Sequence, residues 1–362
     1  MPTCIKKDVP LAPHTTLNIG GCAEYFVEIT DEDRLDEVLL WARENHIRIT
    51  VLGGGSNVLI SDNGIRGLVI KMSMRGIVIE RESGSHTYVR VSAGESWDDF
   101  VVWAVAEGLW GVENLSGIPG SVGASPVQNI NAYGATVSEV IESVSVQDSV
   151  TGKKYILSNS ECKFAYRDSF FKSEVGKMYI ITNVLFKLVK EKKANVTYKS
   201  SSQSIKSFLE KENNINPTPS DIRRAVLHAR KNIGMLLGMV QSAGSFFKNV
   251  IVTKEEFMHL DAVVSERYSE KSERLAPWHW SLPDGKEKVS TAFLMECTQY
   301  NKASYKDKTF NGTVSISPFH TLSIINCGGA HASDVIAFSS EIISEVRKEF
   351  GVMIEPEVCY ME

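Results

Sequence analysis

The stretch from residue 51 to 59 (VLGGGSNVL) restricts the fold more than any other part of the sequence. Apolar and polar residues alternate from 47 to 51, which predicts a half-buried strand that stops at the first glycine. The three glycines at 53–55 can adopt positive φ and leave room for another group against the backbone. With Ser56 and Asn57 beside them, the N–H groups of such a turn form an anion-binding concavity. Such a concavity suits a pyrophosphate, so a nucleotide cofactor is the first hypothesis.

Two common phosphate-binding sequences do not explain this stretch. The dinucleotide fingerprint G-x-G-x-x-G would use Gly53 and Gly55, but Val58 stands at its third glycine and no helical pattern follows. The P-loop needs glycine-lysine followed by serine or threonine, which is absent here. A plain glycine turn between two strands therefore remains the alternative.

Composition limits the class of protein. At 362 residues the chain exceeds one ordinary hydrophobic core, so about two or three domains are expected. Hydrophobic residues make up 43% and charged residues 23%, as in soluble globular proteins. The net charge of -5 argues against nucleic acid or an anionic membrane as a partner. Anionic ligands must then be bound by local basic groups.

The histidines and cysteines give no metal-ligand spacing. Free thiols in a reducing cytoplasm are the simpler interpretation of the six cysteines. The first residues lack the apolar core of a signal peptide, and no window is long enough to span a bilayer. We therefore expect a cytosolic, soluble protein without a metal.

Periodic patterns predict a mixture of helices and short strands. A helix is expected over 31–46 and another around 97–107, because apolar residues recur on one face of each. The first face consists of Leu35, Val38, Leu39 and Ala42, and the second of Trp97, Phe100, Val101 and Ala104. Between 110 and 134 lies a long, glycine-rich, mostly uncharged connection. Such a connection in a compact domain is usually functional or disordered, and its apolar residues speak against disorder.

Further helices and a final strand are expected in the second half. Ser220 is the predicted cap of a helix that buries Ile222, Ala225, Val226 and Ala229. Another helix is expected from Ser333 to a stop at Gly351. The chain should finish on a strand over 352–360.

Arg167 lies in a Tyr-Arg-Asp-Ser sequence flanked by aromatic residues. A guanidinium in such surroundings either pairs with a carboxylate, here Asp168, or clamps a planar anionic ligand with its two-pronged fork. The local sequence leaves both interpretations open.

Ser245 follows a glycine and precedes two phenylalanines. This arrangement can present a hydroxyl at a strand end in a place poor in water, or it can be a turn serine that caps a backbone N–H. A hydrolase nucleophile is disfavoured because Phe247 fills the last glycine of G-x-S-x-G. Lys248 and Asn249 can bind a phosphate-bearing ligand or lie on the surface.

Glu355 and Glu357 are two residues apart on the final predicted strand and would share one face. Partial burial would raise the pKa of one of them and let it act as an acid or charge partner. Exposed edge glutamates are the alternative.

Seven segments, in this order, resemble the UDP-N-acetylenolpyruvoylglucosamine reductase family of flavoenzymes, which make UDP-N-acetylmuramate for bacterial peptidoglycan. They are 18–21 (NIGG), 53–59 (GGGSNVL), 113–123 (ENLSGIPGSVG), 128–134 (QNINAYG), 166–169 (YRDS), 243–249 (AGSFFKN) and 354–358 (IEPEV). Each is weak alone, whereas their joint order and spacing are specific.

The resemblance implies an α+β fold: a two-part FAD-binding module of the vanillyl-alcohol-oxidase type and a C-terminal α+β substrate-binding domain. The implied domains are 1–75, completed by the C-terminal strand 352–362, then 76–212 and 213–351. It also implies a cytoplasmic monomer whose small-molecule partners are NADPH and UDP-N-acetylglucosamine enolpyruvate. In the family, NADPH reduces the flavin, hydride passes from flavin N5 to C3 of the enolpyruvyl ether, and a serine protonates C2.

The resemblance further assigns site residues. It implies that Ser245 is the proton donor. It also implies that Arg167 and Glu357 bind or polarise the substrate carboxylate. The implied FAD contacts are Gly53, Gly54, Gly55, Ser56, Asn57, Ile118, Pro119, Gly120, Ser121, Gly123, Gln128, Asn129, Ala132, Tyr133 and Gly134. The implied substrate contacts are Tyr133, Tyr166, Tyr198, Arg230, Lys248 and Asn249, with Tyr198 on a substrate-closing loop.

The chain departs from the family pattern at a few positions. Ile233 stands where the family commonly has lysine, Val250 where it has proline, and His320 where it has glutamine. These changes bear on the substrate diphosphate. Two other functions remain as alternatives: another flavin oxidoreductase on the same fold, and a nucleotide-sugar-binding protein without catalysis.

Overall fold

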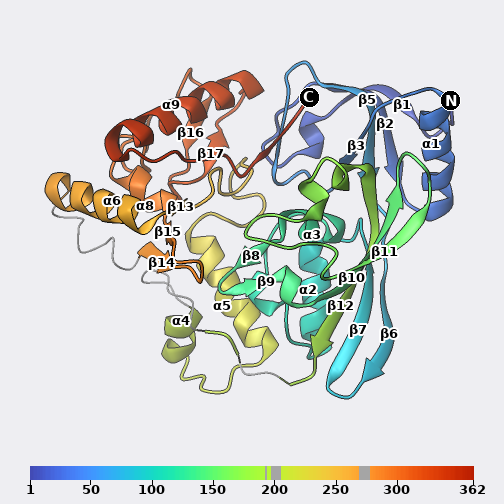
Figure 1. The fold of residues 1–362 in the computed structure, drawn as a ribbon, viewed down its shortest axis with the longest axis horizontal. Helices are drawn as coiled ribbons and strands as arrows, with labels where there is room; N and C mark the ends of the chain where they lie inside the picture. Colours follow the sequence, from blue (N-terminus) through green and yellow to red (C-terminus); the bar gives the residue numbers. More distant parts are fainter. Residues whose placement is uncertain (192–193, 197–204, 269–277) are drawn as a thin grey trace. The chain divides into compact units, whose positions relative to one another are not determined.

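The computed structural model describes residues 1–191, 194–196, 205–268 and 278–362. Figure 1 shows them as helices and short strands. The chain forms two compact units. The first consists of Met1–Leu11, Cys22–Ser56 and Gly64–Leu237. The second consists of Ala12–Gly21, Asn57–Asn63 and Gly238–Glu362, so three separate stretches build each unit.

A four-stranded sheet forms the first part of unit one (Figure 1). Its strands, in spatial order, are β1 (Lys6–Pro10), β2 (Cys22–Ile29), β5 (Ile65–Met72) and β3 (Ile49–Leu52). Strand β1 is antiparallel to β2, whereas β2, β5 and β3 run parallel. The predicted strand into the glycine run is confirmed as β3.

Helix α1 (Glu32–Glu44) follows β2 and confirms the helix expected over 31–46. The Asp31 carboxylate accepts the Arg34 N–H at 2.8 Å and so caps its first turn. All four residues of its predicted apolar face are buried in the core. The spacing of apolar residues was enough to predict this helix, because one of its sides faces the core and the other faces water.

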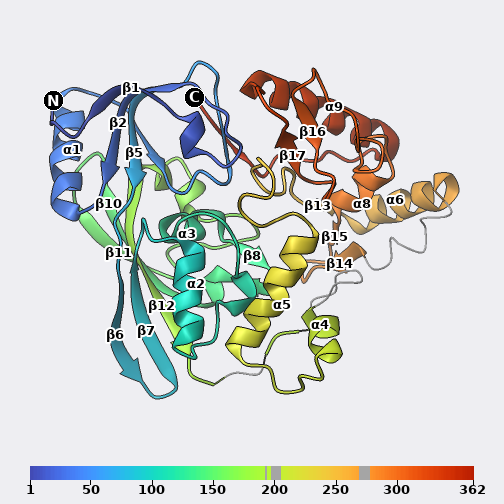
Figure 2. The same cartoon turned by 180° about the vertical axis from the view of Figure 1, so that it is seen from behind.

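A five-stranded antiparallel sheet follows, in the order β11 (Lys154–Ser158), β10 (Ile141–Asp148), β12 (Tyr179–Val189), β7 (His86–Ser92) and β6 (Ile77–Ser83). Helix α2 (Trp97–Ala106) covers one face of it (Figure 2). Phe100 of α2 stacks on Phe186 of β12 with ring centroids 4.6 Å apart. The predicted apolar stripe of this helix is confirmed as core.

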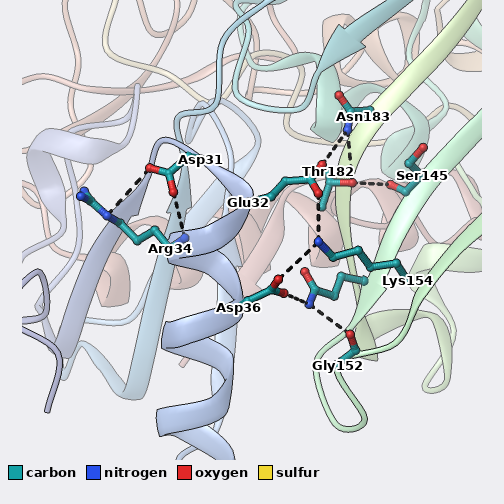
Figure 3. Close-up of polar contacts among 10 residues, drawn as sticks. Asp31, Glu32, Arg34, Asp36, Ser145, Gly152, Lys154, Thr182 and Asn183 are labelled. Carbon is teal, nitrogen blue, oxygen red and sulfur yellow. Dashed lines mark hydrogen bonds and ion pairs between the residues drawn. The ribbon is translucent and has the colours of Figure 1, made fainter.

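Polar contacts join α1 to the second sheet, as Figure 3 shows. The Lys154 ammonium lies 3.0 Å from a Glu32 carboxylate oxygen and 3.4 Å from one of Asp36. Because these side chains are about half exposed, each pair is worth at most about 1 kcal/mol. The apolar residues shared by α1 and both sheets are therefore the main link within this unit.

Helices α4 (Ile205–Lys211) and α5 (Pro219–Asn232) complete unit one. The prediction that Ser220 caps α5 is wrong. The cap is Thr218, whose hydroxyl accepts the Asp221 N–H while the Asp221 carboxylate accepts the Thr218 N–H. Pro219 explains the shift, because its fixed φ and missing N–H suit the first helical position. The predicted buried face of α5 is confirmed.

In its described residues, unit two contains small sheets and longer α-helices. Strand β13 (Val250–Val252) pairs with β15 (Glu287–Val289), which pairs with β14 (His279–Ser281); β16 (Val314–Ile316) pairs with β17 (Ile324–Asn326). Strand β4 (Val58–Ile60) runs parallel to β18 (Cys359–Met361). The helices are α6 (Lys254–Arg267), α8 (Thr291–Glu296) and α9 (Ala332–Phe350).

Two expectations for the C-terminal region meet different outcomes. The helix expected before Gly351 is confirmed as α9, which Gly351 ends with a φ of 72°. The strand expected over 352–360 is wrong, since regular pairing begins only at Cys359. Pro356, which has no N–H to donate, lies in the middle of the expected strand and forms a single bridge to Phe247.

Helix α9 carries charged residues along its exposed side.

No helix in the described ranges combines the length and the apolar character needed to cross a membrane. All six cysteines are free thiols, as expected.

Candidate cofactor and catalytic site

The glycine run after β3 packs backbone to backbone against residues 118–121. A Cβ added to Gly54 would lie 2.6 Å from the Cα of Gly120, so no larger residue fits without moving the backbone. The Ser56 hydroxyl donates to the Pro119 carbonyl at 2.9 Å and holds the two loops together. Gly55 has a φ of 66°, which glycine adopts without strain. The two predicted cofactor loops therefore form one assembly.

Ser121 supplies an unused hydrogen-bonding group in this assembly. Its hydroxyl is buried and has no hydrogen-bond partner in the described part of the chain. A Cβ on Gly53 would lie 2.6 Å from this hydroxyl, so glycine keeps the space beside it open. An unsatisfied buried hydroxyl costs about 1–3 kcal/mol. A ligand oxygen here would remove that cost, which fits a phosphate-bearing cofactor.

The segment after α3 (Ser125–Gln128) turns sharply at two predicted cofactor residues. Asn129 and Tyr133 have φ of 43° and 49°, unusual for residues with side chains. The Asn129 amide donates to the Ala165 carbonyl at 2.8 Å, and its oxygen accepts the Ser138 N–H at 3.3 Å. This amide therefore fixes the loop. Ala132 lies in the short hairpin of β8 (Asn131–Ala132) and β9 (Ala135–Thr136), next to Gly134.

Arg167 occupies a strained turn close to this segment. Its φ is 52°, and the Ala165 and Asp168 backbones bond to each other across the turn at 3.0 and 3.2 Å. Lys172 donates to the Arg167 carbonyl at 2.7 Å. Backbone strain of this kind costs about 1–3 kcal/mol and concentrates at functional sites. The Asp168 carboxylate accepts the neighbouring Ser169 N–H at 2.9 Å, so it helps to shape the turn.

Arg230, near the end of α5, is a buried charge. One guanidinium N–H donates to the Met235 carbonyl at 2.7 Å. Its Nε is buried without a hydrogen-bond partner among the described residues. Burial lowers the pKa of Arg230, whereas Tyr133 and Asp98 favour its charged form. Arginine keeps its proton in proteins at neutral pH, so the group can bind an anion.

Ser245 lies in an extended segment of unit two that is bonded on both sides. The N–H of Phe246 donates to the Leu322 carbonyl at 2.8 Å, and its carbonyl accepts the Glu357 N–H at 2.7 Å. The Ser323 hydroxyl donates to the Gly244 carbonyl at 2.9 Å. The backbone thus brings Ser245 to within one residue of the Phe246–Glu357 pair, although the sequence separates them by more than a hundred positions.

The two glutamates at the C-terminus have different environments. The Glu355 side chain is 70% exposed and lies 3.4 Å from the Lys248 ammonium, as the exposed-edge interpretation expects. Glu357 is only partly exposed. Asn57, in the same unit, donates from its amide to the Glu357 carbonyl at 3.3 Å. Burial therefore favours Glu357 over Glu355 as the residue with a site role.

The Asn249 amide oxygen accepts the Thr291 N–H at 3.2 Å, at the start of α8. Tyr198 lies outside the described residues. The remaining predicted site residues fall into two groups, one in each unit. Unit one holds Gly53–Ser56, 118–123, 128–134, Tyr166, Arg167 and Arg230; unit two holds Asn57, Ser245, Lys248, Asn249, Glu355 and Glu357.

Sequence reasoning missed two charged residues beside the cofactor loops, Asp98 on α2 and Arg223 on α5. They form an ion pair of 2.6 Å although 125 residues separate them. Their helices were predicted, but nothing in the spacing of either residue indicates the other.

Two family models match the chain. The model described as "FAD binding domain" covers residues 23–157. The model described as "UDP-N-acetylenolpyruvoylglucosamine reductase, C-terminal domain" covers residues 237–361. Together they span the glycine loops of unit one and the Ser245 and Glu357 segments of unit two.

Relatives match over the whole length. The chain is 36% identical over 362 residues to the UDP-N-acetylenolpyruvoylglucosamine reductase of Thermobifida fusca, covering 99% of this chain and 98% of the relative. It is 35% identical over 353 residues to that of Bdellovibrio bacteriovorus, covering 98% of each. The crystal structure of UDP-N-acetylenolpyruvylglucosamine reductase from Thermus caldophilus has the same fold, with a TM-score of 0.66, 22% identity and 99% of both chains covered. The expected fold class is thus confirmed.

Proposed function

This chain belongs to the UDP-N-acetylenolpyruvoylglucosamine reductase family, and from that premise we propose that it reduces UDP-N-acetylglucosamine enolpyruvate to UDP-N-acetylmuramate, with FAD as cofactor and NADPH as reductant. The observation that carries the proposal is the match to named reductases along 99% of the chain. Its product is a peptidoglycan precursor. We further propose that the enzyme acts in the cytoplasm as a monomer.

The loops around Gly54 and Gly120 are the proposed FAD-binding elements. When bound, FAD supplies the two-electron chemistry that links NADPH to the carbon–carbon double bond. The unsatisfied hydroxyl of Ser121 supports this assignment, because an oxygen-rich cofactor can satisfy it. Backbone N–H groups of the glycine run would bind the pyrophosphate. The turns at Asn129 and Tyr133 would shape the wall that contacts the flavin.

Ser245 is the proposed acid. Its hydroxyl would donate a proton to C2 of the enolpyruvyl group, since a neutral O–H leaves no permanent charge in a site poor in water. Ser245 is partly buried, and the two phenylalanines that follow it are fully buried. The strand-like bonds of Phe246 to Leu322 and Glu357 fix the backbone next to Ser245.

Arg167 and Glu357 are the proposed groups for the substrate carboxylate. A guanidinium can bind a carboxylate through two parallel N–H donors and stabilise the negative charge that grows on it during reduction. The strained, well-bonded turn of Arg167 supports this role, because a preorganised donor does not reorient during the reaction. Glu357 would polarise the same carboxylate.

The proposed substrate contacts are Tyr133, Tyr166, Arg230, Lys248 and Asn249. Tyr198 is a further proposed contact, on a loop that closes over the substrate. Arg230 suits a diphosphate, because its buried charge has a free donor among the described residues.

One assay tests the proposed function. Purified protein should carry flavin absorbance, and it should oxidise NADPH much faster when UDP-N-acetylglucosamine enolpyruvate is present. Flavin-containing protein that oxidises NADPH equally fast without this substrate would instead be another oxidoreductase on the same fold. Protein that binds the sugar nucleotide but never reduces it would be a binding homologue.

A further inference from the structure

The carboxylate of Asp98 connects helix α5 to the glycine-rich loop that begins at Gly117. Both oxygens of Asp98, on α2, bond to the Arg223 guanidinium, at 2.6 and 2.8 Å. One of them also accepts the Gly117 N–H at 2.6 Å. The side chains of Arg223 and Asp98 are 15% and 33% exposed, so water screens this pair less than a surface pair. Asp98 therefore joins two helices and a loop.

Gly117 is enclosed by the same helix. Its φ is 70°, and an added Cβ would lie 2.9 Å from Leu227 and 3.2 Å from Arg230 on α5. Gly117 directly precedes the Ile118–Gly120 stretch that packs on Gly54. A shift of Gly117 would thus be passed along the backbone to the cofactor loops.

The charged side chains around Gly117 favour the hydrogen bond between its N–H and the Asp98 carboxylate. Arg223 and Arg230 lie seven residues apart, two turns along one side of α5. Burial alone would raise the pKa of Asp98, but the bonds from Arg223 and the Gly117 N–H outweigh it and lower that pKa. The carboxylate is therefore charged at neutral pH and stays bonded to both partners.

We propose that the Asp98–Arg223 pair is a positioning device for FAD binding: it fixes Gly117 so that residues 118–121 hold the conformation that accepts the cofactor. The proposal rests on the FAD binding proposed above. Helix α5 lies between the two segments matched by the family models, 23–157 and 237–361, so neither match assigns it this role. Asp98 and Arg223 act through Gly117, which makes them positioning residues.

Adjacent arginines on α5 allow a matched test. Arg224 forms its own ion pairs, with Glu212 at 2.5 Å and Asp221 at 3.0 Å, and neither partner lies in a cofactor loop. We expect Arg223→Ala to raise the FAD dissociation constant roughly 10- to 100-fold, because small misplacements of binding groups have effects of that size. Arg224→Ala should leave it within about twofold, as for a surface pair. Equilibrium dialysis of the purified holoenzyme measures both constants.

Three further variants separate positioning from folding. Asp98→Asn keeps an acceptor for the Gly117 N–H, so its FAD dissociation constant should lie between those of the wild type and Asp98→Ala. The double variant Asp98→Ala with Arg223→Ala should bind FAD no more weakly than Asp98→Ala alone, since both residues act through one contact. Circular dichroism of each variant reports its unfolding temperature.

The proposal is overturned if Arg223→Ala lowers the unfolding temperature but leaves FAD affinity equal to that of Arg224→Ala. It is also overturned if the two alanine effects simply add. Should the alanine variants fail to fold, Arg223→Lys and Asp98→Asn replace them in the test. An FAD affinity equal to that of the wild type in both variants would then contradict the proposal. A wild-type protein that binds no FAD would instead refute the proposed function.

Discussion

At the scale of single residues, the hydroxyl of Ser245 carries the most specific chemical prediction. We expect Ser245→Ala to lower turnover of the enolpyruvyl substrate by about 10²–10⁴-fold, the usual size of a lost proton donor. Reduction of the flavin by NADPH should be nearly unchanged, because that half-reaction needs no protonation of C2. Stopped-flow absorbance separates the two halves. Ser242→Ala is the control, since that hydroxyl accepts the Gly244 N–H beside the same segment; equal losses in both variants would contradict the assignment.

A second residue-scale prediction concerns the contact between the glycine loops. The Cβ of Gly54→Ala would meet the backbone of Gly120 at 2.6 Å, and this overlap should lower the free energy of unfolding by about 1–3 kcal/mol. Gly53→Ala should cost less, because its Cβ meets side-chain atoms and no backbone: the Ser121 hydroxyl at 2.6 Å, which can rotate, and the Ala124 Cβ at 3.3 Å. Urea unfolding of the two variants tests this order, and a reversed order would show that the loops separate easily.

At the scale of elements, the corrected cap of α5 leads to a paired prediction. Thr218→Ala removes the capping hydroxyl and should cost about 1 kcal/mol. Ser220→Ala should change stability by less than about 0.5 kcal/mol, since that residue is already inside the helix. Thermal unfolding of the two variants measures the difference in stability. An equal loss of stability in both would contradict Thr218 as the cap.

Helix α9 begins on a carboxylate from a distant part of unit two. Asp62 accepts the N–H groups of Ala332 and Ser333 at 2.6 and 3.0 Å. Burial would raise the pKa of Asp62, but these bonds and nearby His331 outweigh it and lower that pKa in the folded state.

This lowered pKa predicts an acid-sensitive contribution to stability. It is fully present above the pKa of an unfolded aspartate, about 3.9, and it is lost as pH falls through the lower folded value. The urea midpoint of Asp62→Asn should therefore lie below that of the wild type at neutral pH, and the two should converge in acid. A pH-independent difference would contradict this linkage.

At the scale of the whole molecule, bound FAD should stabilise the protein by mass action. At a free concentration 100 times the dissociation constant, the gain should be about 2.7 kcal/mol. Tryptophan fluorescence during urea unfolding, with and without added FAD, measures it, and adenosine is a control ligand that lacks the diphosphate and flavin. No shift with FAD would count against the proposed cofactor.

The sequence predicted the periodic elements and the glycine loops, because their signals are local. The buried face of α1 and the strand into Gly53 depend on residues only a few positions apart. Contacts between distant segments left no such signal: neither the Asp98–Arg223 pair nor the bond of Asp62 to α9 can be read from spacing. The strand expected over 352–360 was wrong for a local reason, because Pro356 has no N–H to donate and interrupts the alternating pattern.

The pairing of β4 with β18 has a consequence for biosynthesis. Residues 58–60 leave the ribosome long before their parallel partner at 359–361 is translated. During synthesis β4 therefore waits with unpaired backbone groups, which other nascent chains can also bind. A stop codon at position 359 would remove this partner strand and leave the edge open permanently, so the shortened product should be prone to aggregation.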